Sequence, residues 1–464
     1  MQKILSLIVV LCLSLAANAQ PFFENVAYRG AIGTTNWAGA AWTNWNPQNT
    51  NYPSVSSPQG RTVVNVSGDI SGNVTWTSSQ LIVAAGAIHV LDGATLTIEP
   101  GCVIRGSLAS RFTLIVARGG RIVADGTPTN PIVFTSIADA GQRVRGDWGG
   151  VLICGRAQCN KPNAKYEALP SDPLADYGGN NDNDNSGSMS YVRIEYAGFN
   201  YLPNQEINSL TMCAIGKGTQ INNIMTSFGL DDQFEWFGGA SNHKYLIAYA
   251  GTDDDFDADQ GYRGNWQFLL GVRNPGVFET GGARSSNGFE IDNNTGFNGT
   301  TGSATGESVN GAQLPTPTTE VLASNVTLVG PIRNGETNAN HSDRFNYGLE
   351  LRSASKVSVQ NSIITGYFGL TRFVNGGTAS THSTARWHAE GASSIANCIY
   401  ATTSGSDVFT ASTNQESDLT FNPTTYLNSN NVRVARNSFT FATAGYTGNP
   451  LGDLDQINFA NVNY

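Results

Sequence analysis

The chain has 464 residues and a formal net charge of -10, because 36 acidic side chains outnumber 26 basic ones. Only 13% of its residues are charged, which argues against a long solvated helical array or a coiled coil. The acidic balance also argues against a nucleic-acid partner, because neutralising phosphates requires clustered Lys and Arg.

Residues 1–19 have the pattern of a secretory signal peptide. Lys3 supplies a positive start, residues 4–17 form an apolar stretch, and Ala17-Asn18-Ala19 provides a small-residue cleavage site. The apolar stretch is too short to span a bilayer and no second one follows, so we expect no transmembrane segment. The sequence therefore predicts a protein that is secreted, either extracellular or held at the outer cell surface.

Residues 20–75 form an N-terminal segment that precedes the first clear strand repeat. Trp37, Trp42 and Trp45 give this segment an aromatic character. Because the core of a repeat protein is open at its ends, we expect this segment to cap the first repeat. Residues 76–464 are then predicted to form one repeat domain.

Five cysteines follow the signal-like segment, an odd number that cannot form a complete disulfide framework. Cys154 and Cys159 could close a short loop through a disulfide. Alternatively, most of the five are small buried residues on strands.

From Trp76 onward, short β-rich runs alternate with turns that contain Gly, Asn, Asp or Pro. The runs are three to five residues long, and no amphipathic helix pattern of 12 or more residues competes with them. Such runs can build a sandwich, a barrel or a solenoid. Examples are residues 81–83, 88–91, 95–98, 113–116 and 132–134.

An internal repeat favours the solenoid. Asn325, Asn361 and Asn397 each lie between two apolar runs and are spaced 36 residues apart. Asn side chains stacked at the same turn of successive coils can satisfy one another and the turn backbone. The fold class predicted is therefore all-β, a right-handed parallel β-helix with long loop excursions.

Several short sequence motifs resemble those of a family of exported bacterial proteins with the right-handed parallel β-helix, or pectin-lyase-like, architecture. The resemblance covers most of residues 21–400 and implies the same solenoid. Relatives are often exported by type IX secretion, so the resemblance also implies export. These motifs are residues 28–31 (YRGA), 95–101 (TLTIEPG), 146–150 (GDWGG) and 234–239 (FEWFGG).

Two stretches interrupt the repeat. Residues 160–187 contain three prolines and then an Asn- and Asp-rich run, and residues 293–320 are rich in Gly, Thr, Ser and Asn. Both are predicted to be long excursions from the solenoid, where functional residues often lie.

Three acidic segments align on Phe234, Phe256 and Phe289, with offsets of 22 and 33 residues. If these rings point inward, strand alternation directs the carboxylates beside them outward. Neighbouring coils would place those carboxylates about 4.8 Å apart. The outward carboxylates are those of Glu235, Asp257, Asp259, Glu290 and Asp292.

Two carboxylates at that spacing repel by roughly 3–4 kcal/mol at an effective dielectric near 20. A bound cation relieves the repulsion, and calcium suits because it accepts several flexible oxygen ligands. Solvated carboxylates, or pairing with Arg263, Arg273 or Arg284, are the alternatives. The predicted calcium ligands are Glu235, Asp255, Asp257, Asp259, Glu290 and Asp292.

A weaker calcium candidate lies in the first long loop. Residues 182–187 (DNDNSG) match the first six positions of an EF-type loop, with Asp182 and Asp184 as ligands. The twelfth position is Arg193 rather than Glu, so the bidentate ligand is missing.

Catalysis at the acidic segments is one functional hypothesis. Pectin-lyase-like enzymes hold calcium against an acidic sugar or use carboxylates as general acid and base, and paired carboxylates suit glycoside hydrolysis. The sequence lacks the Gly-His-Gly and Arg-Ile-Lys partner motifs of the polygalacturonase branch. The candidate catalytic residues are Asp232, Glu235, Asp254, Asp257 and Arg263, with Lys217 or Arg273 as another base or clamp.

The other hypothesis is a binding module that binds glycan or another extracellular polymer, with calcium as a cofactor. Tyr262 and Trp266 lie close to the acidic segments and could stack on sugar rings, with Arg273 as a polar contact. A purely structural surface role is also compatible with the pattern. We expect an extracellular polysaccharide or surface polymer as the partner.

Overall fold

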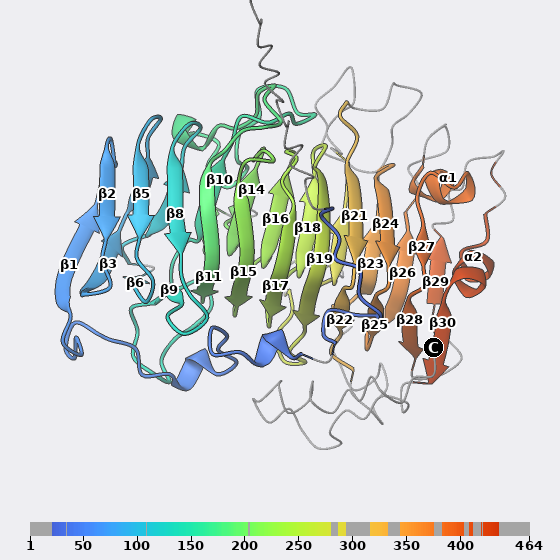
Figure 1. Cartoon of the computed structure of the whole chain (residues 1–464), viewed down its shortest axis with the longest axis horizontal. Helices are drawn as coiled ribbons and strands as arrows, with labels where there is room; N and C mark the ends of the chain where they lie inside the picture. The colour runs from blue at the N-terminus through green and yellow to red at the C-terminus, as the bar shows by residue number, and fades with distance from the viewer. Residues whose placement is uncertain are drawn as a thin grey trace, which may run out of the picture.

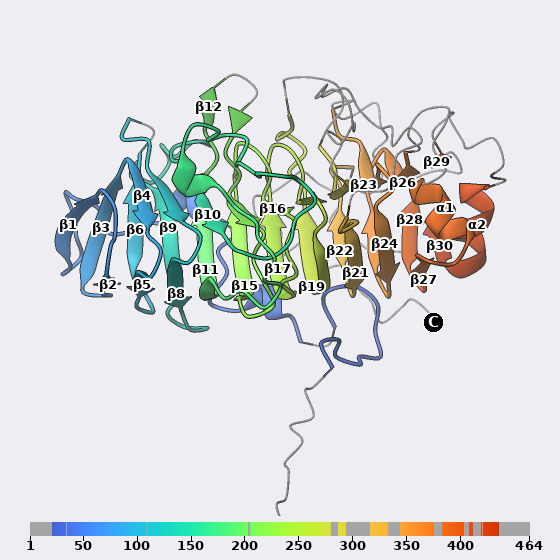
Figure 2. The same cartoon turned by 90° about the horizontal axis from the view of Figure 1, so that it is seen from above.

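The computed structural model describes residues 21–33, 35–107, 109–202, 205–279, 286–293, 316–332, 344–374, 383–402, 408–411, 419 and 421–435. These residues form coils of short parallel strands stacked along one long axis (Figures 1 and 2). The predicted all-β parallel β-helix is therefore confirmed. Three faces run along the solenoid, and we call them the first, second and third face.

The first face is a ten-stranded parallel sheet. Its strands are β4 (Ala87–Val90), β7 (Thr113–Val116), β10 (Val151–Cys154), β14 (Leu210–Cys213), β16 (Phe234–Phe237), β18 (Phe256–Asp259), β20 (Phe289–Ile291), β23 (Tyr347–Leu351), β26 (Gly369–Phe373) and β29 (Val408–Ala411).

The second and third faces share four long strands that turn the corner between them: β11 (Gly187–Glu195), β15 (Gln220–Ser227), β17 (His243–Tyr249) and β19 (Arg263–Val272). The second face adds β2 (Asn73–Trp76), β5 (Thr95–Ile98), β8 (Arg121–Asp125), β21 (Glu320–Ser324), β24 (Lys356–Gln360) and β27 (Ile395–Ala396). The third adds β1 (Thr62–Ser67), β3 (Gln80–Ala85), β6 (Val103–Gly106), β9 (Ile132–Ser136), β22 (Thr327–Val329), β25 (Ile363–Thr365), β28 (Ile399–Thr402) and β30 (Val432–Ala435).

Few elements lie outside the coils. They are a hairpin of β12 (Asn200–Leu202) and β13 (Gln205–Glu206), the 3-10 turns η1 (Trp37–Gly39), η2 (Pro47–Asn49) and η3 (Pro173–Ala175), and the helices α1 (Thr384–Ala389) and α2 (Pro423–Asn430). Among the described residues, no helix is long and apolar enough to cross a membrane.

The interior of the solenoid is a stack of apolar side chains. Phe234, Phe256 and Phe289 are fully buried, and the rings of Phe234 and Phe256 stack with centroids 5.4 Å apart. The three rings therefore point inward as the sequence predicts. Because side chains alternate along a strand, the residue that follows each phenylalanine faces outward.

The predicted Asn stack forms at the corner between the second and third faces. Asn325, Asn361 and Asn397 all have positive φ, at 55°, 51° and 57°. The Asn397 amide donates to Asn361 Oδ1 at 2.5 Å, and the Asn361 amide donates to Ser324 Oγ at 3.3 Å. Asn suits this corner because it tolerates the left-handed conformation and supplies the ladder bonds.

Substituting Asn361→Ala should lower the free energy of unfolding by about 1–2 kcal/mol, because alanine strains the left-handed corner and breaks the ladder. Denaturant unfolding measures this loss. Asn361→Gly is the matched control, since glycine keeps the conformation and loses only the side-chain bonds. Equal stability of the alanine variant and the parent would contradict the ladder's contribution.

Residues 21–33 and 35–60, which we call the N-terminal strap, begin beside the second face, where Glu24 contacts Lys244 and Gln267, and then lie along the third face (Figure 1). The Gly30 amide donates to the Asn361 carbonyl at 2.6 Å, near one end of the solenoid. Trp42 and Trp45 are buried farther along. They pack on outward side chains of the third face that include Met225, Ile247, Tyr249 and Leu270.

The prediction that this segment caps the first repeat is therefore wrong. The outward residues of the third face are apolar, and burying them against the tryptophans removes that surface from water. The solenoid also begins earlier than residue 76, because β1 already pairs in parallel with β3 from Thr62 onward.

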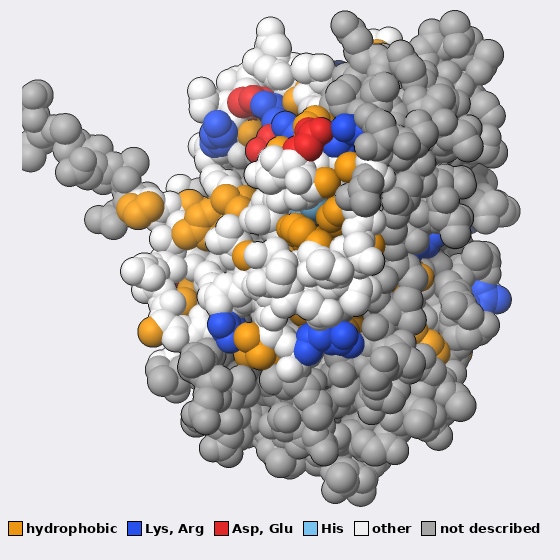
Figure 3. Space-filling view, turned by 90° about the vertical axis from the view of Figure 1, so that its right-hand side faces the viewer, with side chains coloured by type: hydrophobic (Ala, Val, Ile, Leu, Met, Phe, Trp, Pro, Cys, Tyr) orange, Lys and Arg blue, Asp and Glu red, His pale blue; other side chains and the backbone are white. Residues whose placement is uncertain are grey.

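Helix α2 lies against the last described strands, where its Leu427 is buried. Viewed from that end, the described surface carries hydrophobic side chains near its middle and a group of acidic and basic side chains at one edge (Figure 3).

Residues 160–186 leave the solenoid and fold back over the first face, and Gly187 already begins β11. Tyr166 and Tyr177 are buried there against Cys213 and Phe237, which are outward residues of β14 and β16. Of the second predicted loop, residues 294–315 lie outside the described residues.

The five described cysteines are free thiols, so Cys154 and Cys159 form no disulfide. Cys154 instead neighbours Cys213 across the first face. Four of the five are buried, as expected for small residues on or beside strands.

Candidate functional site

A row of polar side chains runs up the outside of the first face, one residue from each coil. Parallel register places Thr211, Glu235, Asp257, Glu290, Glu350 and Arg372 at equivalent positions. We call this set the carboxylate row. Glu235, Asp257 and Glu290 were predicted to stack, and the 33-residue step to Glu290 is confirmed because Phe256 pairs with Phe289.

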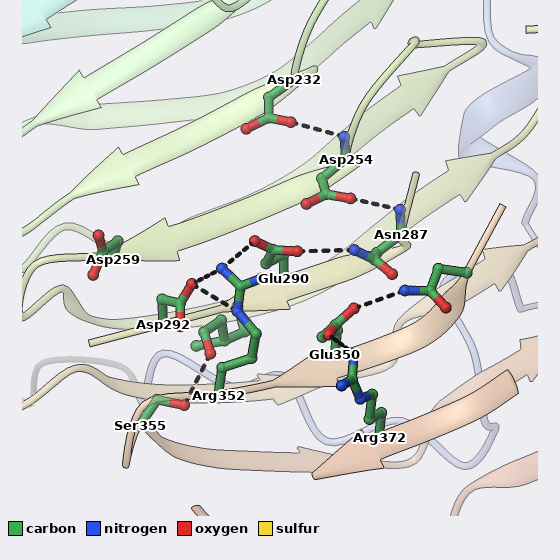
Figure 4. A network of polar contacts seen from close by, with 12 residues as sticks. Asp232, Asp254, Asp259, Asn287, Glu290, Asp292, Glu350, Arg352, Ser355 and Arg372 are labelled. Carbon is green, nitrogen blue, oxygen red and sulfur yellow. Dashed lines mark hydrogen bonds and ion pairs between the residues drawn. The ribbon is translucent and has the colours of Figure 1, made fainter. Parts of the chain in front are cut away.

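A second row lies at the turn that precedes each strand. Asp232 Oδ1 accepts the backbone N–H of Asp254 at 2.7 Å, and Asp254 Oδ1 accepts that of Asn287 at 2.5 Å (Figure 4). The next backbone N–H, that of Tyr347, donates to Asn287 Oδ1 at 3.0 Å. These bonds fix the carboxyl groups of Asp232 and Asp254 beside the carboxylate row.

Asparagine amides contact the three glutamates of the row. Asn287 Nδ2 donates to Glu290 at 2.9 Å, Asn346 Nδ2 donates to Glu350 at 3.1 Å, and Asn208 Nδ2 donates to Glu235. Asp257 differs, because its Oδ1 is buried without a hydrogen-bond partner.

Two arginines neutralise one end of the row. Arg352 Nη2 lies 2.6 Å from Glu290 Oε1, and its Nε donates to Asp292 Oδ2 at 2.9 Å (Figure 4). Arg372 Nη1 lies 2.7 Å from Glu350 Oε1.

The other end of the row has no such neutralisation. Among the described residues, no basic side chain forms an ion pair with Asp232, Glu235, Asp254 or Asp257. Carboxyl groups without a basic partner are therefore concentrated on the coils of β16 and β18.

Burial raises the pKa values of these carboxyl groups. Asp232, Glu235, Asp254 and Asp257 all have a pKa well above the usual range, because they are withdrawn from water and because neighbouring carboxylates disfavour a further negative charge. The same effects raise the pKa of Glu290 to about 8, although Arg352 opposes the rise. Perturbed titration of this kind is typical of functional sites.

Three sets of carboxylates could share one cation, because within each set one oxygen from every residue lies within 4.8 Å of the others. The sets are Asp232, Glu235 and Asp257; Asp254, Asp257 and Glu290; and Asp231, Asp232 and Asp253. Asp232 and Asp257 each belong to two of them, and both belong to the set that includes Glu235, which is the centre of the candidate site. A shared proton or a hard cation with oxygen ligands would each relieve the repulsion.

Two predicted residues, Asp255 and Arg273, are removed from the site by burial. Their side chains are 0% exposed and form an ion pair inside the coil, with Arg273 Nε 3.2 Å from Asp255 Oδ1. Tyr367 also donates to Asp255, at 3.2 Å. The predictions of Asp255 as a calcium ligand and of Arg273 as a ligand contact or base are therefore wrong.

The predicted aromatic platform is also wrong. Tyr262 and Trp266 are 0% exposed, and the Trp266 indole N–H donates to the Tyr262 hydroxyl at 2.8 Å. Trp236 packs on Trp266 with ring centroids 4.6 Å apart. These rings fill the solenoid because they have the apolar surface that its interior requires.

Asp259 and Asp292 lie at the far ends of their strands. Asp259 accepts the backbone N–H of Gln260, while Asp292 is held by Arg352. Neither belongs to the described carboxylate sets that could share a cation, so the predicted ligand set is reduced to Glu235, Asp257 and Glu290.

Arg263 lies elsewhere, at the corner between the first and second faces. Its Nη2 forms an ion pair with Asp182 at 2.9 Å, so its prediction as a catalytic residue of the row is wrong. Asp182 also accepts the Gln158 N–H at 3.1 Å, and Asp184 accepts the Ser186 hydroxyl at 3.1 Å. These contacts stabilise the loop, and neither carboxylate belongs to a described set that could share a cation.

Glu350, Arg352 and Arg372 were not predicted. Residues 349–352 (LELR) repeat the alternation of residues 289–292 (FEID), which is the signal that could have revealed Glu350 and Arg352. Arg372 carries no comparable signal.

The comparisons with known proteins identify the fold family. A family model described as a pectate-lyase-like β-helix domain matches residues 68–447. No curated protein matches the sequence. One similar solved structure is the catalytic domain of a GH87 alpha-1,3-glucanase variant in complex with nigerose, with 12% identity and a TM-score of 0.26. That alignment covers 77% of this chain and 64% of the glucanase chain, which is less than two thirds of the latter. On the strength of the family model, this chain belongs to the pectate-lyase-like β-helix domain family.

Proposed function

We propose that this protein binds an extracellular glycan at the carboxylate row, with calcium held between the carboxylates. The supporting observation is the convergence of Asp232, Glu235 and Asp257, whose oxygens lie within 4.8 Å of one another. Calcium fits this donor set, because it takes six to eight oxygen ligands in a flexible geometry. Sugar hydroxyls or a sugar carboxylate would complete the coordination.

The location of the proposed binding outside the cell follows from residues 1–19, whose pattern is that of a signal peptide. This segment lies outside the described residues. Export would bring the protein to an environment where calcium is abundant and polysaccharides are available.

A second function, glycoside hydrolysis, is favoured by one specific difference between Glu235 and Asp257. Glu235 accepts an amide hydrogen bond from Asn208, which stabilises its charged form, whereas Asp257 Oδ1 has no donor. Asp257 would hold the proton as general acid and Glu235 would be the ionised partner. Their closest oxygens are within 4.8 Å, which favours a retaining arrangement over an inverting one.

Retention on insoluble polysaccharides, measured with calcium and then with chelator, tests the binding function. We expect calcium-dependent retention on at least one polysaccharide, and we expect Asp257→Asn to abolish it. Glu320→Gln is the matched control, because it removes one exposed carboxylate from the second face. Retention that is unchanged by chelator and by the Asp257→Asn substitution would contradict the proposal.

Release of reducing ends from the same polysaccharides separates hydrolysis from binding. If the chain is a hydrolase, release should fall by about 10²-fold or more in Glu235→Gln and in Asp257→Asn, because each substitution removes one member of the acid/base pair. Calcium-dependent retention without release would leave binding alone.

A further inference from the structure

A groove of about 460 Å³ lies on the second face, apart from the carboxylate row. It is formed where β15 and β17 meet the start of the N-terminal strap, and both polar and apolar side chains line it. The residues that matter for its chemistry are Lys217, Gln220, Asn222, Asn242 and Lys244, with Phe22 as one wall.

Two of the amides in the groove are held in a fixed orientation. Asn222 Oδ1 accepts the backbone N–H of Lys244 at 2.8 Å, and Asn242 Oδ1 accepts that of Asn265 at 2.9 Å. In both cases the amide oxygen is occupied by the next coil. The NH₂ groups are therefore the ends that remain for a ligand, and both are hydrogen-bond donors.

Two ammonium groups add positive charge to these donors. Lys217 is exposed at the turn between β14 and β15, and it forms no ion pair with any described residue. Lys244 Nζ lies 2.8 Å from Glu24 Oε1 and 5.0 Å from the centroid of the Phe22 ring. The groove thus combines donors and an unneutralised cation in a chain whose net charge is -10.

We propose that this groove binds a glycan that carries anionic groups, either carboxylates or sulfates. An anionic group supplies acceptors for Lys217 and for the amide NH₂ groups, since charge-assisted hydrogen bonds are the stronger ones. Phe22 and Tyr245 offer ring surfaces for the apolar face of a sugar. This site is distinct from the carboxylate row, which would repel the same ligand unless calcium were bound.

Isothermal titration of the full chain in chelator tests the proposal without contribution from calcium at the row. The probes are a trigalacturonate, a sulfated trisaccharide and the neutral maltotriose. We expect at least one anionic probe to bind and maltotriose to bind at least tenfold more weakly. Whichever anionic probe binds shows whether the groove recognises carboxylate or sulfate.

Two variants examine the groove itself. Lys217→Gln should weaken binding of the anionic probe about tenfold, which is the value of one charge-assisted hydrogen bond. Asn242→Asp keeps the oxygen that accepts from Asn265 and replaces the donor by a negative charge, so binding should be lost. Lys165→Gln, which removes the same charge from the long loop, should bind as the parent does.

The proposal is overturned if neither anionic probe binds, or if maltotriose binds equally well. It is also overturned if Lys217→Gln and Asn242→Asp bind like the parent while remaining folded. Equal binding of a short single-stranded oligonucleotide would show that the groove recognises negative charge in general, and would overturn the glycan assignment. Because the glycan binding proposed for the carboxylate row requires calcium, outcomes measured in chelator are independent of that function.

Discussion

Substituting Arg273→Met should lower the free energy of unfolding by about 3–5 kcal/mol, because it leaves the Asp255 carboxyl group inside the solenoid without its ionic partner. Both side chains are 0% exposed, so water cannot replace the lost partner. Arg273 also donates to the backbone carbonyls of Gly251, Asp253 and Asn287, and these acceptors lose their donor as well.

The stability that Arg273→Met loses relative to the parent should increase as the pH rises. Burial already raises the pKa of Asp255 to about 7, even though Arg273 opposes the rise. Without Arg273 the pKa rises further, so the folded state holds a proton that the unfolded state releases above its ordinary carboxyl pKa. Stability is then lost progressively as pH increases through the interval between the two pKa values.

Urea unfolding at pH 5 and pH 8 measures both effects. The double variant Asp255→Asn, Arg273→Met is the control, because it removes the buried charge together with its partner. We expect the double variant to recover part of the loss and to show a weaker pH dependence than Arg273→Met. A single variant within 1 kcal/mol of the parent at both pH values would refute the account of this pair.

The second large effect concerns the carboxylate row in the absence of divalent cations. In chelator, the free energy of unfolding should fall by roughly 2–5 kcal/mol as the pH is raised from about 4.5 to about 8. The folded-state pKa values of Asp232, Glu235, Asp254 and Asp257 are raised, and that of Glu290 is about 8. The folded protein therefore binds more protons than the unfolded chain in this interval, so stability decreases with pH.

Calcium should reverse much of this decrease. A ligand that binds only the folded state adds about 2.7 kcal/mol when present at 100 times its dissociation constant. Asp257→Asn should reduce both the pH dependence in chelator and the response to calcium, because Asp257 belongs to two of the carboxylate sets. Glu320→Gln should change neither.

Thermal unfolding with added calcium, magnesium or chelator at pH 5 and pH 8 provides the measurement. A melting temperature that is the same in calcium and chelator at pH 8 would remove the basis for a calcium site. The row would then hold shared protons instead of a cation.

Strand alternation around phenylalanine was sufficient to predict the central part of the site. Phe234, Phe256 and Phe289 pointed inward as expected, so Glu235, Asp257 and Glu290 had to face outward. The rule depends only on the two-residue period of a strand, which the local sequence contains in full.

The wrong predictions concern residues whose side-chain direction is not determined by strand alternation. Asp255 lies in a turn, where the backbone no longer alternates and the side chain can point into the coil. Trp266 lies on a strand, but an aromatic residue suits either side of a coil, and the sequence does not say which side is filled. The position of the N-terminal strap depends on the outward residues of coils that come hundreds of positions later in the chain.

The N-terminal strap also determines how the solenoid can unfold. In a linear array each coil contacts only its neighbours, so coils at the ends can fray independently of the rest. Here Arg29 donates to Asn397, 368 residues away, while Tyr52 packs against β3 and β6 of the first coils. An opening of the last coils therefore releases the strap, and release of the strap exposes apolar surface on many coils at once. The strap converts a row of separable repeats into one cooperative unit.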